Sequence, residues 1–146
     1  MTTISVVIGR FGAPNRNGDV FIMDEAALRE RLDKMVGKVV GETSQNAITS
    51  ELKGMPDLSS QLNRIERVDA LKSAGTLMGY QIGRFAGGEL IVMGDVEPSP
   101  LLLNLLEHDP TPAFGIRCLT QPRSPTENKI QVMNLISFDY LPPTER

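Results

Sequence analysis

The stretch TLMGYQIGRFAGGELIVMGDV, residues 76–96, decides the fold. Apolar and β-branched residues fill it on both sides of Gly87-Gly88, and a glycine pair between two such runs is typical of a β-hairpin turn. The stretch therefore predicts two antiparallel strands, over 76–85 and 89–96. The spacing of the apolar residues in 61–71 fits a helix as well as a bulged strand. We predict a strand there, so that the three segments form an antiparallel meander.

Upstream of this block, β-branched residues predict strands over 4–10 and 19–22. Asp24 can cap a helix whose apolar residues recur at helical spacing, and Gly37 is its expected stop. A short strand follows over 38–42. Residues 43–60 are polar and contain a glycine and a proline, so we predict a long loop that orders when it binds a partner.

Downstream, Ser99 and Pro100 have the residue types favoured at the start of a helix. The leucines that follow surround the helix axis, which predicts a well-buried helix. The strands 113–119 and 129–139 come next, and a short tail occupies 141–146. We expect 4–10 and 129–139 to be sheet edges available for docking.

These elements predict an α+β fold, a mostly antiparallel β-barrel or curved sheet with two to three peripheral helices. The chain has 146 residues, of which 40% are hydrophobic and 23% charged. This composition is ordinary for a globular protein, and the length suits one domain over 1–146.

Charge and composition argue against several classes of partner. The formal net charge is −3 and the basic residues are spread along the chain, which argues against nucleic acid binding. No apolar run approaches the ~20 residues that a membrane helix needs, so we expect no membrane partner. The chain has one cysteine and one histidine, which match no spacing of metal ligands, and we expect no metal site and no cofactor.

The residues suited to nucleophilic catalysis are few. Cys118 and His108 could form a nucleophile and base, with Asp139 or Glu107 orienting the histidine. The alternative is that His108 is an exposed residue at a helix end and Cys118 a small core residue. Ser137 and Asp139 share one face of the last strand, where they could serve a triad or form a polar outer face.

Several short motifs resemble those of the prohead (capsid maturation) proteases of tailed bacteriophages, whose fold is shared with herpesvirus assemblin. Residues 15–21 read Asn-Arg-Asn-Gly-Asp-Val-Phe, similar to the segment that opens those proteases. The sequence then has Gly37-Lys38, Gly41-Glu42, Gly115-Ile116 and Phe138-Asp139 in the family's order. The resemblance spans about residues 14 to 141, and it implies the protease fold.

The departures from the family's pattern concern its catalytic residues. The resemblance places the catalytic histidine on or near Gln45, and an amide cannot act as a general base near neutral pH. It places the nucleophilic serine after Gly115-Ile116, where the chain has Arg117 and Cys118. Losing base and nucleophile together removes nearly all catalysis, because these groups act as a unit.

The resemblance and its departures together imply a phage virion structural protein: a capsid decoration, cement or internal head protein on an inactive protease fold. We expect it to bind the major capsid protein, as a small homo-oligomer or through lattice contacts, in a capsid assembled in the host cytoplasm. The candidate binding residues are Asn15, Arg16, Asn17, Gln45 and Arg117. One alternative is an active maturation protease that uses Cys118, His108 and Asp139. Another is a regulatory or metabolic domain outside any virion.

Overall fold

The computed structural model describes residues 2–15, 17–122 and 126–146, and its strands form two sheets. The first sheet has the order β1-β5-β4-β3 and the second has the order β2-β7-β6. The strands of the first sheet are β1 (Ile4–Phe11), β3 (Val39–Glu42), β4 (Ser73–Arg84) and β5 (Leu90–Pro98). Those of the second sheet are β2 (Val20–Ile22), β6 (Ala113–Thr120) and β7 (Lys129–Leu141).

The hairpin predicted over 76–96 is confirmed as β4 and β5. Gly87 and Gly88 at its turn have φ values of 81° and 83°, a left-handed conformation that favours glycine. The Phe85 N–H donates to the Glu89 carbonyl at 2.9 Å and closes the loop. The long paired strands then form the centre of the first sheet.

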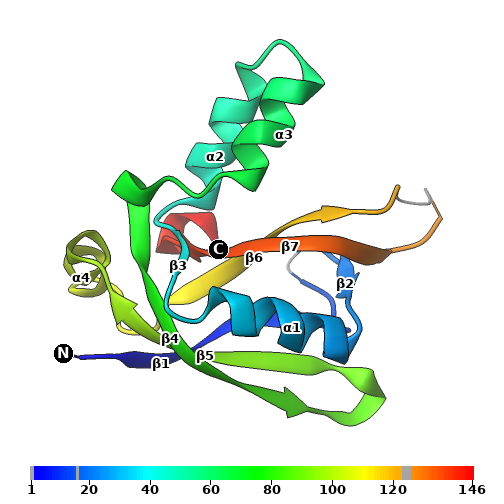
Figure 1. The fold of residues 1–146 in the computed structure, drawn as a ribbon, viewed down its shortest axis with the longest axis horizontal. Coiled ribbons are helices and arrows are strands. Elements are labelled where there is room, and N and C mark those ends of the chain that lie inside the picture. The colour runs from blue at the N-terminus through cyan, green and yellow to red at the C-terminus, as the bar shows by residue number, and fades with distance from the viewer. Residues whose placement is uncertain (1, 16, 123–125) are drawn as a thin grey trace.

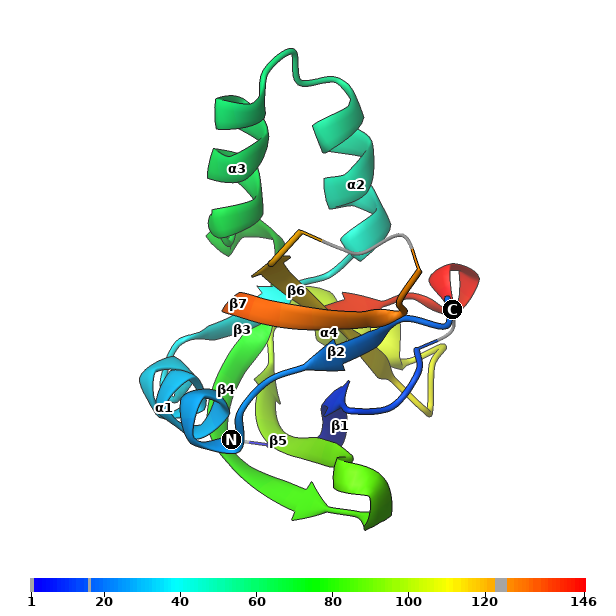
Figure 2. The same cartoon turned by 90° about the vertical axis from the view of Figure 1, so that its right-hand side faces the viewer.

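The α+β fold is also confirmed, as a curled half-barrel of mostly antiparallel strands (Figures 1 and 2). Among the described strands, β2 and β7 alone pair in parallel. The strands β1 and β6 lie side by side, yet the two sheets are not joined there by strand pairing in the described ranges. The barrel is therefore open along this seam. The prediction that 129–139 forms an edge is wrong over residues 129–131, where β2 pairs with β7 on the side away from β6.

Helix α1 (Glu25–Met35) covers one side of the core, as its sequence pattern predicted. The Asp24 side chain accepts from the Ala27 N–H at 3.3 Å, which caps the first turn. Leu28 and Leu32 are completely buried in the core between the sheets. Arg31 extends to β7, where its Nε donates to the Leu135 carbonyl at 2.6 Å. The helix thus ties the first sheet to the second.

The predicted loop over 43–60 and the predicted strand over 61–71 are both wrong. These residues form a helical hairpin of α2 (Gln45–Lys53) and α3 (Leu58–Glu66), which rises from the body in Figure 2. Ser44 caps α2 at 3.1 Å and Asp57 caps α3 at 2.7 Å. Each helix is short, so the spacing of its apolar residues is a weak indication of helix. The capping residues Ser44 and Asp57 are the stronger indication that a helix begins after each of them.

Helix α4 (Pro100–Leu106) starts at the predicted Ser99 cap but is not well buried. Among its leucines only Leu102 is buried, and Leu101 and Leu103 are 43% and 51% exposed. The helix lies at one end of the molecule rather than between layers (Figure 1). Counting α4, the described ranges hold four α-helices where two or three were predicted. None of them is long and apolar enough to cross a membrane.

The predicted short tail over 141–146 is not loose. It forms a 3₁₀ turn over Pro143–Glu145, and both of its last side chains are bonded to the body. The Glu145 carboxylate accepts from the Ser44 Oγ at 2.9 Å and the Asn46 N–H at 2.8 Å. Arg146 pairs with the buried Asp109. The tail therefore fixes the start of α2.

Candidate functional site

Five charged side chains meet where the α2–α3 hairpin contacts β3, β6 and β7. We call this set the ion-pair cluster, and it consists of Glu42, Glu51, Arg64, Arg117 and Asp139. All of them except Glu51 are buried. Burying a charge is costly unless it is paired and hydrogen-bonded, so the partners of each group decide what the cluster can do.

Arg117 is the central cation of the cluster. From β6 its Nη2 donates to the Asp139 carboxylate at 2.9 Å and to Glu42 at 3.1 Å. Its Nε donates to the Ser137 hydroxyl at 2.9 Å, and its Nη1 donates to the Arg67 carbonyl at 2.8 Å. All three of its nitrogens are therefore committed to the protein. Ser137 and Asp139 lie on this buried face of β7, so they do not form a polar outer face.

Arg64 is the second buried cation, and it comes from α3. Its two Nη atoms donate to both oxygens of Glu42, at 2.9 and 2.7 Å, in the two-point geometry that suits a guanidinium and a carboxylate. Its Nε donates to Glu51 of α2 at 2.9 Å. Arg64 thus fastens both helices of the hairpin to β3.

Glu42 receives most of these contacts, and the contacts set its protonation. Burial by itself raises the pKa of a carboxyl group, because it disfavours the charged form. The hydrogen bonds from Arg64 and from the Asp69 N–H, together with the charge of Arg117, outweigh burial and lower the pKa of Glu42 below its usual value. Glu42 is therefore a carboxylate across the neutral range.

The ion-pair cluster has a structural role, because its groups bond to one another and not to a ligand. Within the described ranges, no buried side-chain nitrogen or oxygen lacks a hydrogen-bond partner. An acid or base that acts on a ligand must be able to reach it, and these groups point at one another instead. The cluster holds the α2–α3 hairpin on the sheet.

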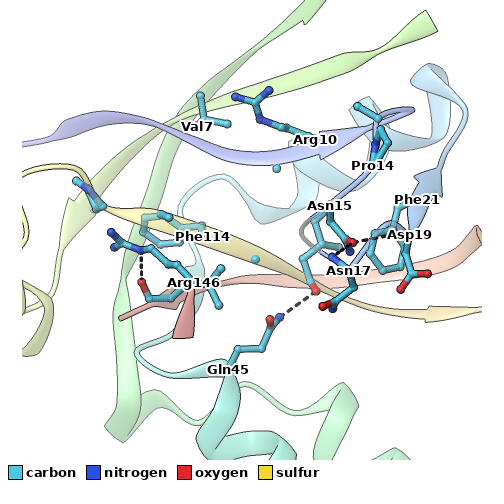
Figure 3. A pocket seen from close by; sticks show the side chains of 17 residues that line it. Val7, Arg10, Pro14, Asn15, Asn17, Asp19, Phe21, Gln45, Phe114 and Arg146 are labelled. Atoms are coloured by element: carbon cyan, nitrogen blue, oxygen red, sulfur yellow. Dashed lines mark hydrogen bonds between the residues drawn. The ribbon is translucent and has the colours of Figure 1, made fainter. Parts of the chain in front are cut away.

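An open cleft of about 680 Å³ lies beside the cluster, between β1, the loop after it, and the start of β6 (Figure 3). This volume is in the range of pockets that bind ligands. Its apolar lining includes Phe21, Phe114 and Ile116, and Arg10 and Arg146 stand at its rim. Asn15, Asn17 and Gln45, all predicted as binding residues, line the same cleft.

Gln45 crosses the face of β6 to reach this cleft. Its Nε2 donates to the Ile116 carbonyl at 3.0 Å. The side chain passes directly over Gly115, where an added Cβ would lie 2.8 Å from the Gln45 Oε1. A glycine at 115 is what lets the amide approach the strand. Gln45, at the position that the resemblance assigns to the base, thus contacts Ile116, which is 71 residues away in sequence. Ile116 directly precedes the segment in which the resemblance places the nucleophile.

The other predicted binding residues have distinct environments. The Asn15 Oδ1 accepts from the N–H groups of Asn17 and Asp19 at 2.9 and 3.0 Å, which makes the segment a self-supporting turn. Arg16 lies outside the described residues. Arg117 is in the ion-pair cluster and does not line the cleft.

The three residues of the alternative catalytic set are not arranged as a triad. Asp139 is fully buried and bonded to Arg117. His108 is exposed just after α4, and no hydrogen bond joins it to Cys118 in the described parts of the chain. Cys118 is half-buried against the core, and burial raises the pKa of its thiol to about 11. A reactive cysteine needs the opposite shift.

Cys118 should accordingly react very slowly with alkylating reagents. With a pKa of about 11, only about one thiol in a thousand is ionised at pH 8, against roughly one in four for a free cysteine. We expect iodoacetamide to modify the folded protein at least about 100-fold more slowly than the urea-unfolded chain, as followed by intact mass. Equal rates in the two states would contradict this environment for Cys118.

In the described ranges, no group of three or more His, Cys, Asp or Glu side chains could hold a metal ion. Two charged side chains that line the cleft are paired within the protein, since Arg146 pairs with Asp109 and Arg10 lies 3.4 Å from Glu89.

Sequence reasoning missed Glu42 and Arg64 as partners, and it missed Arg10 and Arg146 at the cleft. Gly41-Glu42 was predicted only as a motif of the resemblance, and Arg64 was predicted to lie in a strand. Even a helix assignment for 58–66 would not have placed Arg64 on the face of Leu62 and Ile65, because residues one or two apart do not share a helix face. No local signal marks the two cleft arginines.

Comparisons with family models, with curated proteins and with solved structures found no match for this chain.

Proposed function

We propose that this chain is a phage virion structural protein on a catalytically inactive, prohead-protease-like fold, and that it binds the major capsid protein. The observation that carries the proposal is the contact between Gln45 and Ile116 at the edge of an open cleft. The resemblance places the family's histidine on or near Gln45 and its serine after Gly115-Ile116. At the contact itself, a side-chain amide bonds to a backbone carbonyl, and neither group is a general base or a nucleophile.

The chemistry at this contact favours binding over catalysis. A glutamine amide offers a donor and an acceptor but cannot take up a proton near neutral pH. The next side chain along β6, Arg117, is turned to the opposite side and is held by buried carboxylates. In the described parts of the chain, the cleft has no nucleophile and base that face each other. Such a site can hold a protein segment without cleaving it.

The alternative of an active protease gains no support from the geometry. Its nucleophile would be a thiol whose pKa is raised by burial, and its orienting carboxylate is already committed to Arg117. A regulatory or metabolic domain would be expected to offer an anchored polar site for a small ligand, and the cleft's charged residues are paired within the protein.

The test is to mix the purified chain with assembled capsid protein and to measure both binding and mass. We expect the chain to sediment with the particles at a stoichiometry comparable to that of the capsid protein. The intact masses of both proteins should stay constant, because no bond is cleaved. Asn17→Arg should weaken binding at least about tenfold by filling the cleft, whereas Lys34→Ala on the far side of α1 should not.

Two outcomes would overturn the proposal. One is that the chain fails to sediment with capsid particles at any concentration tested. The other is that the capsid protein is shortened in its presence and that Cys118→Ala prevents the shortening, since this result would establish the protease.

A further inference from the structure

The cleft runs along an edge of β6 that pairs with no other strand in the described ranges. β6 is the last strand of the second sheet, and β7 pairs with it on one side only. The Ile116 carbonyl accepts from the Gln45 side chain, which approaches from the side away from β7. In a strand the N–H and C=O of one residue point the same way, so the Ile116 N–H also faces the cleft.

The partner strand β7 independently indicates that the Ile116 N–H and C=O point away from it. Ile116 pairs with Phe138 in the antiparallel ladder. The Phe138 carbonyl points away from β6, because a Cβ added to Gly41 of β3 would lie only 2.0 Å from that oxygen. The pair is therefore of the kind that exchanges no hydrogen bonds. Since the pattern alternates, the Phe114–Tyr140 pair is of the same kind, and the Phe114 N–H and C=O also face the cleft.

The opposite wall of the cleft is a second free edge. β1 is the outer strand of the first sheet, and Val7 and Gly9 on it line the cleft. The seam between β1 and β6 is closed by side chains at one point, where a Cβ on Gly9 would meet the Phe138 ring at 2.7 Å and Ile116 at 3.4 Å. From there towards Ala113, the residues of β6 line the cleft.

We propose that the cleft binds an extended segment of a partner protein, which adds as a new strand to the free edge of β6 at Phe114 and Ile116. This inference rests on the proposed function, because it names the way in which a non-catalytic cleft holds its protein partner. The addition supplies strand partners for the Phe114 N–H and C=O and for the Ile116 N–H, and it begins to close the half-barrel along its seam. The Ile116 carbonyl already accepts from Gln45, and its second lone pair can accept from the added strand.

The cleft also defines the chemistry of the occupant. The lining stretch of β6 from Ala113 to Ile116 spans about 13 Å, at about 3.3 Å per residue, so about four residues of the partner can pair. Successive side chains of that segment point to opposite faces. One set meets Phe21, Phe114 and Ile116 and should be apolar. The other set lies towards the asparagines and Gln45 and should be polar.

A nuclear magnetic resonance experiment tests the inference on the full chain. The probe is a blocked seven-residue peptide of alternating valine and threonine at millimolar concentration. We expect the hydrogen exchange of the Phe114 and Ile116 amides to slow at least about tenfold when the peptide saturates. The amides of Gly115 and Arg117, which already face β7, should keep their exchange rates. Exchange that is unchanged at Phe114 and Ile116 would overturn the inference.

Two N-methylated forms of the peptide are the matched controls. One carries methyl groups on the valine nitrogens and the other on the threonine nitrogens, so their side chains are identical. Only one set of nitrogens faces β6 in an added strand, and methylation there removes the donors. One form should lose at least about tenfold in affinity while the other keeps the affinity of the parent. Equal affinity for both forms would mean that side chains alone are recognised, and it would overturn strand addition.

The failure of this inference can be told from the failure of the proposed function. A chain that sediments with capsid particles but shows no selective protection at Phe114 and Ile116 leaves the proposed function standing and removes strand addition. A chain that shows the protection with the peptide but ignores capsid particles leaves strand addition standing and removes the capsid protein as partner.

Discussion

Glu42→Gln is expected to lower the free energy of unfolding by about 3–5 kcal/mol, the cost typical of removing one partner from a buried ion pair. Glu42 is only 1% exposed and bonds to both buried arginines of the ion-pair cluster. A glutamine has the same shape, but its NH₂ group must face a guanidinium that cannot accept a hydrogen bond. The measurement is the urea unfolding curve of each protein at pH 7.

Glu51→Gln is the matched control, because it removes the same charge from the rim of the same cluster. The Glu51 side chain is 37% exposed, so water can replace its contact with Arg64. We expect a cost of about 1 kcal/mol or less. A Glu42→Gln variant that loses no more stability than Glu51→Gln would show that the buried pairs do not hold the hairpin.

Acid should reveal the same interaction in the unmodified protein. The pKa of Glu42 is lower in the folded state than its ordinary value of 4.5, so its contribution to stability is complete above about pH 4.5. The contribution is lost as the pH falls through the folded pKa. The difference in stability between the wild type and Glu42→Gln should therefore shrink below pH 4.5, a readout that simple loss of packing would not produce.

Local signals account for the parts of the fold that sequence predicted correctly. The strand pair around Gly87-Gly88 and helix α1 each carry their own periodicity, turn or cap within about 20 residues. The hairpin of α2 and α3 was missed, since each helix has only nine residues and its stability comes largely from contacts with the sheet. The leucine content of α4 led to the wrong prediction of a well-buried helix, because composition does not determine how much of a helix packs against the rest of the protein.

The candidate site shows the same division. Asn15, Asn17 and Gln45 were predicted as binding residues and lie together in one cleft, whereas the ion-pair cluster was not foreseen. Its members come from five separate elements, and Glu42 and Asp139, which meet through a backbone N–H, are 97 residues apart. A charged residue in a sequence is normally exposed, so nothing local marks these five as buried.

Gly41→Ala is expected to be severely destabilising, with a loss of at least about 3 kcal/mol or a failure to accumulate as folded protein. The added Cβ would lie 2.0 Å from the Phe138 carbonyl oxygen and 2.9 Å from the Asp139 carboxylate. Both are fixed, the first as backbone of the central strand β7 and the second by Arg117. β3 must therefore move off β7 and take Glu42 with it.

Gly54→Ala at the end of α2 is the matched control for that change. The new methyl group would lie 3.6 Å from the Glu51 carbonyl oxygen, which is an ordinary van der Waals contact. The φ of Gly54 is −86°, a value that any residue can adopt. We expect a change within about 1 kcal/mol, with a small gain from the stiffer unfolded chain. Urea unfolding of the two variants gives the comparison. If Gly41→Ala is as stable as Gly54→Ala, then β3 and β7 do not make the close backbone contact that positions Glu42 over Arg117.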